Sequence, residues 1–135
     1  MYAVVSRILS RVNAVAQIFA VIAGLIHVGV FVVESLLFGR PHFSALFLIR
    51  EDDVRVIRPW ATNQGWYNLF LAAGALGGVV LVNSWDETAG RTLALFACGC
   101  MVVAGIVLFV SERRLWRGSL GQAVPPLIAV LASLA

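Results

Sequence analysis

The chain alternates between long apolar runs and short polar segments. Four apolar runs lie at about residues 14–38, 60–82, 91–110 and 120–134, and the last contains Pro125 and Pro126 near its start. As a helix, a run of about 20 apolar residues crosses a hydrocarbon core of about 30 Å. Continuous runs favour helices, whereas a membrane β-barrel needs alternating segments of about ten residues. The pattern therefore predicts an all-α fold, a four-helix transmembrane bundle that forms one domain over residues 1–135.

Small residues recur every four positions within three of these runs. They are Ala16, Ala20 and Gly24 in the first run, Gly74 and Gly78 in the second, and Ala97 and Gly105 on either side of Met101 in the third. Such ridges let two helix backbones approach closely. We therefore interpret them as packing surfaces between helices.

The connections differ in length and character. Between the first two runs, residues 42–49 are apolar but too short to span, so we expect them at the membrane interface. Residues 1–13 carry Arg7 and Arg11, and we expect them to lie along the interface or to begin the first span. The first apolar run is too long for a signal peptide and lacks a clear cleavage site, so we expect a retained helix.

The composition agrees with a chain whose solvent is lipid. Hydrophobic residues make up 61% of the chain and charged residues 13%, with a mean hydropathy of +0.93. Soluble domains are nearer one half apolar and about one quarter charged. No basic run with interleaved aromatic residues occurs, so we expect the lipid bilayer, and no nucleic acid, as a partner. Cys98 and Cys100 fall inside an apolar run and predict neither a disulfide nor a metal site.

The arginines give a prediction of orientation. The net charge of +3 comes from ten arginines against seven acidic residues, and seven of the ten lie in the first and third connections. Positively charged loops tend to stay in the cytoplasm. We therefore expect a multi-pass protein of the inner (plasma) membrane, with loops one and three cytoplasmic and both termini outside. Arg7 and Arg11 favour the opposite orientation for the first helix, so the orientation stays open.

The few polar side chains within the runs gather in one half of the membrane. They are Glu34 near the end of the first run, Asn63, Gln64 and Asn68 early in the second, and Gln122 early in the fourth. His27 lies two turns from Glu34 on the same face, about 10 Å deeper in the membrane. Because bare amides and carboxylates are costly in hydrocarbon, we predict that these side chains meet in one inward polar layer.

Two functions from different classes remain open for this layer. In the first, it binds or conducts a small polar ligand, ion or proton, because an ionisable residue within a span is a functional hypothesis by default. The candidate ligand-binding residues are His27, Glu34, Asn63, Gln64, Tyr67, Asn68 and Gln122. In the second, these groups only form hydrogen bonds between helices, and the protein is a structural or accessory subunit, either as a homo-oligomer or in a larger membrane complex.

The other functional classes have less support. No nucleophile–base pair, zinc signature or nucleotide-binding loop is present, so an enzyme is the least favoured class and we assign no catalytic residue or cofactor. His27 and Glu34 supply two of the three or four ligands that a metal site needs. Tyr67 also suits an aromatic belt at the membrane interface, together with Trp60 and Trp66.

Several strings occur together in an order typical of one family. They are His27 and Glu34 with six residues between them, ATNQGWYNLFLAAGAL at 61–76, Ala104–Gly105, and GQAVPPLIAVL at 121–131. The chain resembles the small bacterial integral membrane proteins of the domain-of-unknown-function family numbered thirteen hundred and four. The resemblance implies four transmembrane helices and a membrane location, but no established activity.

The resemblance also marks individual positions. The family residues carried over are His27, Glu34, Asn63, Gln64, Gly65, Tyr67, Asn68, Gln122 and Pro125. The chain has Leu69 where members of the family often have Gly, and its third helix has a long, arginine-rich end. A close backbone approach at position 69 is therefore not expected here.

Overall fold

The computed structural model describes residues 2–134, with side chains described for residues 14–134. The side chains of Arg7 and Arg11 therefore lie outside the described part. Helices make up the regular structure of residues 2–134, and no strand occurs among them. The predicted all-α fold is confirmed.

Among the described residues, four long helices and four short helical elements follow the apolar and polar segments. The long helices are α1 (Tyr2–Phe31), α3 (Val54–Ser84), α4 (Glu87–Ser111) and α5 (Trp116–Leu134). A π-helical turn, η1 (Val32–Leu36), continues α1, and α2 (Pro41–Leu46) and the 3₁₀ turns η2 (Glu51–Asp53) and η3 (Arg113–Leu115) lie in the connections. α3, α4 and α5 extend beyond the predicted runs, because polar residues at their ends continue the helical backbone, whereas α1 begins before its run and, with η1, ends at Leu36 inside it.

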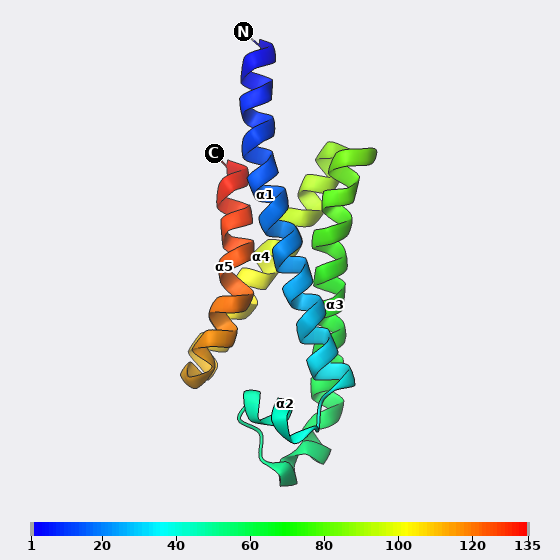
Figure 1. Cartoon of the computed structure of the whole chain (residues 1–135), viewed down its shortest axis with the longest axis vertical. Helices are drawn as coiled ribbons and strands as arrows, with labels where there is room; N and C mark the ends of the chain where they lie inside the picture. Colours follow the sequence, from blue (N-terminus) through cyan, green and yellow to red (C-terminus); the bar gives the residue numbers. More distant parts are fainter. Residues whose placement is uncertain (1, 135) are drawn as a thin grey trace.

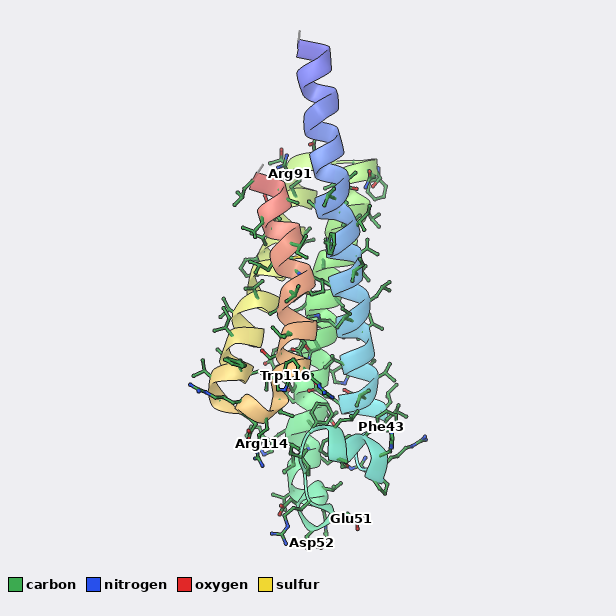
Figure 2. The ribbon with its side chains drawn as sticks, turned by 60° about the vertical axis from the view of Figure 1, so that its left-hand side comes forward. Phe43, Glu51, Asp52, Arg91, Arg114 and Trp116 are labelled. Atoms are coloured by element: carbon green, nitrogen blue, oxygen red, sulfur yellow. The ribbon has the colours of Figure 1, made fainter. Side chains whose placement is uncertain are left out.

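The long helices form a ring around a narrow core. α1 packs against α3 and α5, and α4 packs against the same two helices (Figure 1). The first and third connections lie at the same end of the bundle. Figure 2 shows Arg114 and Trp116 at the end that also carries Glu51 and Asp52, with Arg91 at the opposite end. The two arginine-rich loops are therefore on one side of the bundle, as the helix count requires.

Three helical segments are long and apolar enough to cross a membrane. They are Ala14–Leu36, Glu51–Ser84 and Glu87–Ser111. α5 completes the bundle beside α1 and α4, but its 19 residues include Pro125, Pro126 and a polar first turn. The fourth membrane crossing stays a prediction.

Small residues bring the helices close together, as predicted. Ala20, Ala75, Ala97 and Ala129 lie in the buried core, which also contains Met101. A Cβ added at Gly78 would lie 2.6 Å from the Ala94 nitrogen and 2.7 Å from the Gly90 oxygen, both backbone atoms of α4. The GxxxG motif of α3 is therefore a packing surface for α4, where the backbones approach too closely for any side chain.

Candidate functional site

The site begins at the π-helical turn that ends the first span. The Leu37 nitrogen donates to the Val32 carbonyl at 3.0 Å, which closes a turn one residue wider than an α-helical one. Single π-helical turns within helices are frequently found at functional sites. This turn contains Glu34 and Ser35, so its geometry decides how both side chains meet α3.

Glu34 and Ser35 of this turn pack against α3 at Gly65. The Ser35 hydroxyl donates to the Thr62 carbonyl at 3.2 Å. A Cβ added at Gly65 would lie 3.1 Å from the Glu34 Cβ and 3.3 Å from the Ser35 Cβ. Gly65 thus permits the close approach that places the Glu34 carboxylate beside the polar residues of α3.

The Glu34 carboxylate is held by Asn68. The Asn68 side-chain amide donates to Glu34 Oε2 at 2.9 Å and to the Gln64 backbone carbonyl at 3.2 Å. Asn68 is only 5% exposed, and Glu34 is half-buried. Among the residues with described side chains, the ion pairs join Arg91 to Glu87 and Arg114 to Glu112. Within that part of the chain, Glu34 has a hydrogen-bond donor but no cationic partner.

Glu34 forms part of the wall of a pocket of about 300 Å³ at the end of the bundle that carries the first connection. Its polar lining comes from Glu34, Asn63 and Gln64, and its apolar lining from Phe38, Phe47, Ile49, Trp60 and Ala61. A volume of about 300 Å³ is at the lower end of the range for small-molecule sites. The pocket is open, since Trp60 is 74% exposed and Asn63 and Gln64 are also exposed, and it can hold a small organic molecule against its lining.

The first connection folds back to supply the apolar wall. Gly39, at a φ of +94°, turns the chain after η1, and α2 begins at Pro41. Leu48, at a φ of 59°, then reverses the chain between the two pocket residues Phe47 and Ile49, and the Ile49 nitrogen donates to the Ser44 carbonyl at 3.1 Å. The segment predicted at the membrane interface thus also forms part of the pocket lining.

Not all the candidate residues meet at this pocket. Tyr67 is exposed on the outer side of α3, with its ring 6.2 Å from that of Phe70. Gln122 is half-buried, neither lines the pocket nor hydrogen-bonds to its residues, and so lies apart from the cluster. The polar contact that α5 makes with α4 comes from Ser119, whose hydroxyl donates to the Gly105 carbonyl at 2.6 Å. The polar layer is therefore smaller than predicted and joins η1 to α3 alone.

His27 lies in the bundle core and is not part of the pocket wall. Its side chain is 0% exposed, and Nδ1 lies 2.9 Å from the Ala23 carbonyl of the same helix. Because a carbonyl only accepts, the proton of the neutral ring is on Nδ1 and Nε2 is an acceptor. Nε2 has no hydrogen-bond partner among the described residues. His27 was expected to form a hydrogen bond to another helix, but its hydrogen bond is to Ala23 within α1.

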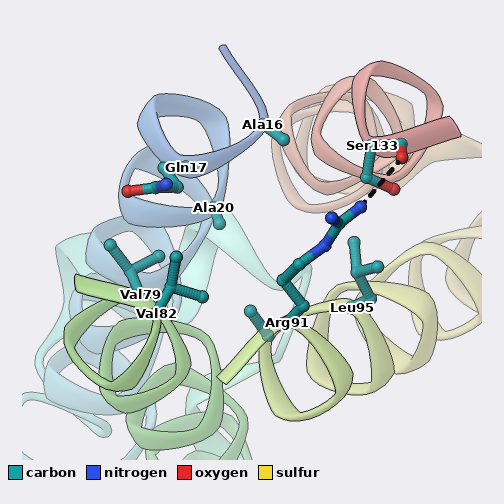
Figure 3. A pocket seen from close by; sticks show the side chains of 9 residues that line it. Ala16, Gln17, Ala20, Val79, Val82, Arg91, Leu95 and Ser133 are labelled. Carbon is teal, nitrogen blue, oxygen red and sulfur yellow. Dashed lines mark hydrogen bonds between the residues drawn. The ribbon is translucent and has the colours of Figure 1, made fainter. Parts of the chain in front are cut away.

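A second cavity lies at the opposite end of the bundle, beside Arg91 (Figure 3). Its volume of about 30 Å³ is enough for about one water molecule. Arg91 donates to the Ser133 backbone carbonyl at 3.3 Å and thereby connects the start of α4 to the last turn of α5. A basic side chain suits the free carbonyls at a helix end. We interpret this cavity as a packing feature around that contact.

The chain and one known family model match over residues 21–134. The model is described as a protein of unknown function, DUF1304. The chain belongs to the DUF1304 family. This confirms the resemblance, and the match includes both the η1–α3 contact and the pocket of this DUF1304 protein. No curated protein and no solved structure matches the chain.

The residue that fixes η1 to α3 and the apolar lining of the DUF1304 pocket, which also includes Ile49 and Ala61, were not predicted from the sequence. Ser35 binds α3, while Phe38, Phe47 and Trp60 line the pocket. Trp60 suited a membrane-interface belt, and Phe47 belonged to an apolar segment too short to span. That short segment was the one available signal, because an apolar stretch that cannot cross the membrane must cover some other surface.

Proposed function

We propose that this DUF1304 protein is a multi-pass membrane protein that binds or conducts a small polar ligand, ion or proton at the Glu34 pocket. The observation that carries the proposal is the Glu34 carboxylate itself. It lies at the pocket wall with one oxygen held by Asn68 and with no cationic partner among the described side chains. An ionised group within a membrane span is costly unless a cation or a proton compensates its charge.

The neighbouring amides make the pocket suited to a polar guest. Asn63 and Gln64 line the pocket one helical turn from Asn68, and each side-chain amide can both donate and accept hydrogen bonds. Asn68 is already occupied by Glu34 and Gln64 and therefore acts as a positioning residue. His27 has a free acceptor deeper in the bundle, which suits a role in moving a proton away from Glu34.

The pocket opens at the end of the bundle that carries both arginine-rich loops. Because positively charged loops tend to remain in the cytoplasm, we place this end on the cytoplasmic side of the inner membrane. The placement requires that α5 cross the membrane as the fourth span. Conduction across the whole membrane would need several copies, since four short helices contain no paired halves.

The test is thermal unfolding of the purified chain in detergent. Sodium, potassium and ammonium salts, small polar compounds, and acidic and alkaline buffers are each compared. We expect at least one cation, or protons, to shift the unfolding temperature of wild type and of Glu51→Gln, which removes an exposed loop carboxylate at the same end. The shift should be absent in Glu34→Gln. Equal shifts in wild type and Glu34→Gln, or no shift in wild type, would contradict the proposal.

A second candidate is an accessory subunit of a larger membrane complex. The observation in its favour is an outward patch of small residues on α3, where Ala73 is exposed and a Cβ added at Gly77 would meet nothing within 4 Å. Small residues of this kind accommodate a partner helix. Copurification in mild detergent tests the candidate: a partner at fixed stoichiometry that Gly77→Leu removes would support it, and a chain that purifies alone would contradict it.

A further inference from the structure

We infer that the ligand of the Glu34 pocket is an amphipathic organic cation, an ammonium group that carries a small apolar or aromatic body. The inference rests on the proposed function, because it names the chemical class that this same pocket would bind. It is carried by the arrangement of the wall, which combines one carboxylate, two amides and three aromatic side chains.

The charge of the pocket selects a cation. Glu34 is the one ionisable residue in the described lining, and no arginine or histidine lines the pocket with it. An anion would be repelled by the carboxylate, and a neutral guest would leave it without a counter-charge in a partly desolvated site. An ammonium group supplies that charge. A primary or secondary ammonium can also donate to Glu34 and to the oxygens of Asn63 and Gln64.

The apolar wall selects an organic cation over an inorganic one. Phe38, Phe47 and Trp60 line the same pocket as Glu34, together with Ile49 and Ala61, and Trp60 is exposed at the pocket's open side. Aromatic faces attract ammonium groups, and their apolar area favours a hydrocarbon body. A sodium ion has several oxygen ligands at short range in most sites, whereas here the polar lining is limited to Glu34, Asn63 and Gln64 in a pocket of about 300 Å³. A hydrated ion would leave the aromatic wall without a partner.

The experiment compares three probes that share a benzyl group by isothermal titration calorimetry on the purified full chain. They are benzyltrimethylammonium, its neutral isostere neopentylbenzene, and the anion phenylacetate. We expect saturable binding of the cation, with affinity at least tenfold above that of either other probe. Glu34→Gln should lower cation affinity at least tenfold and leave the isostere unchanged, since Gln can still accept from Asn68. Glu51→Gln is the matched control and should bind as wild type.

A second variant separates the aromatic wall from the carboxylate. Trp60→Leu keeps an apolar residue but removes the aromatic face, and we expect weaker binding of benzyltrimethylammonium with no change in helical circular dichroism. Equal affinity for the cation and its isostere would overturn the ligand class. Glu34-dependent stabilisation by sodium or protons, without binding of benzyltrimethylammonium, would overturn the ligand class alone. No response to any probe, salt or pH would overturn the proposed function as well.

Discussion

The Asn68 side-chain amide lies between Glu34 and Gln64, 2.9 Å from the Glu34 carboxylate and 3.2 Å from the Gln64 carbonyl. One contact connects α3 to the π-helical turn, and the other holds the amide in place on its own helix. The pair therefore determines where the carboxylate meets the pocket.

A double-mutant cycle on Glu34 and Asn68 measures that contact. Hydrogen bonds between membrane helices are typically worth about 0.6–2 kcal/mol, and those to charged groups about 1.5–3 kcal/mol. We therefore expect Glu34→Ala and Asn68→Ala to couple by about 1–2 kcal/mol in reversible unfolding in mixed micelles. The control cycle pairs Glu34→Ala with Tyr67→Ala, since Tyr67 is exposed on α3 and makes no hydrogen bond to Glu34. Equal coupling in both cycles would contradict the assigned contact.

Adjacent glycines on α3 should respond in opposite ways to the same substitution. A Cβ at Gly78 would meet backbone atoms of α4 at 2.6 and 2.7 Å, whereas one at Gly77 would meet nothing within 4 Å. We expect Gly78→Ala to lower the free energy of unfolding by about 1–3 kcal/mol, the usual cost of overpacking. Gly77→Ala should raise it by up to about 1 kcal/mol through helix propensity. Similar unfolding temperatures for the two variants would exclude the close α3–α4 contact.

Glu112, in the third connection, has a shifted pKa that can be measured independently of the pocket. Hydrogen bonds from the Arg114 side chain and backbone lower the pKa of Glu112 from 4.5 to about 2. Because the folded pKa is depressed, the associated stability is present above the ordinary pKa and is lost as the pH falls toward 2. The effect on stability is small, since the pair is exposed to solvent.

The measurement is a carbon-13 titration of the Glu112 carboxyl by NMR in micelles. We expect its midpoint well below 4.5 in wild type. Arg114→Gln should move the midpoint back toward the ordinary value, while Arg113→Gln, at the neighbouring exposed arginine, should not. A Glu112 midpoint unchanged by Arg114→Gln would mean that the bidentate contact does not form.

The sequence predicts the helices well because their signal is repeated over many residues. About 20 apolar positions in each run indicate the same helix, so the long helices and their small-residue ridges can be predicted from the pattern alone. The meeting of Glu34 and Asn68 also follows, since both lie at the helix ends that flank one connection. The position of a residue along the bundle axis can thus be predicted from its position along the chain.

The rotation of each helix about its own axis cannot be predicted from the sequence in the same way. Gln122 lies early in α5, at the end of the bundle that carries the third connection, but the Ser119–Gly105 contact orients α5, and Gln122 does not line the pocket beside Glu34. The π-helical turn at Val32–Leu36 has no proline or other signature. The apolar wall depends on Leu48 adopting a left-handed conformation, which sequence patterns rarely indicate for leucine.

The docking of η1 on α3 is most directly tested by a disulfide between Ser35→Cys and Gly65→Cys, in a chain with Cys98→Ala and Cys100→Ala. A Cβ at Gly65 would lie 3.3 Å from the Ser35 Cβ and 3.1 Å from the Glu34 Cβ, and it would overlap the Ser35 hydroxyl that the cysteine replaces. Since a disulfide places its Cβ atoms about 3.8 Å apart, the bond forms if η1 moves from α3 by a few tenths of an ångström. We expect mild oxidation in native membranes to form this bond efficiently, whereas Leu36→Cys with Gly65→Cys should remain reduced, since Leu36 is 64% exposed. Efficient cross-linking of the Leu36 pair with a reduced Ser35 pair would show that Glu34 is turned away from Asn68 and the pocket.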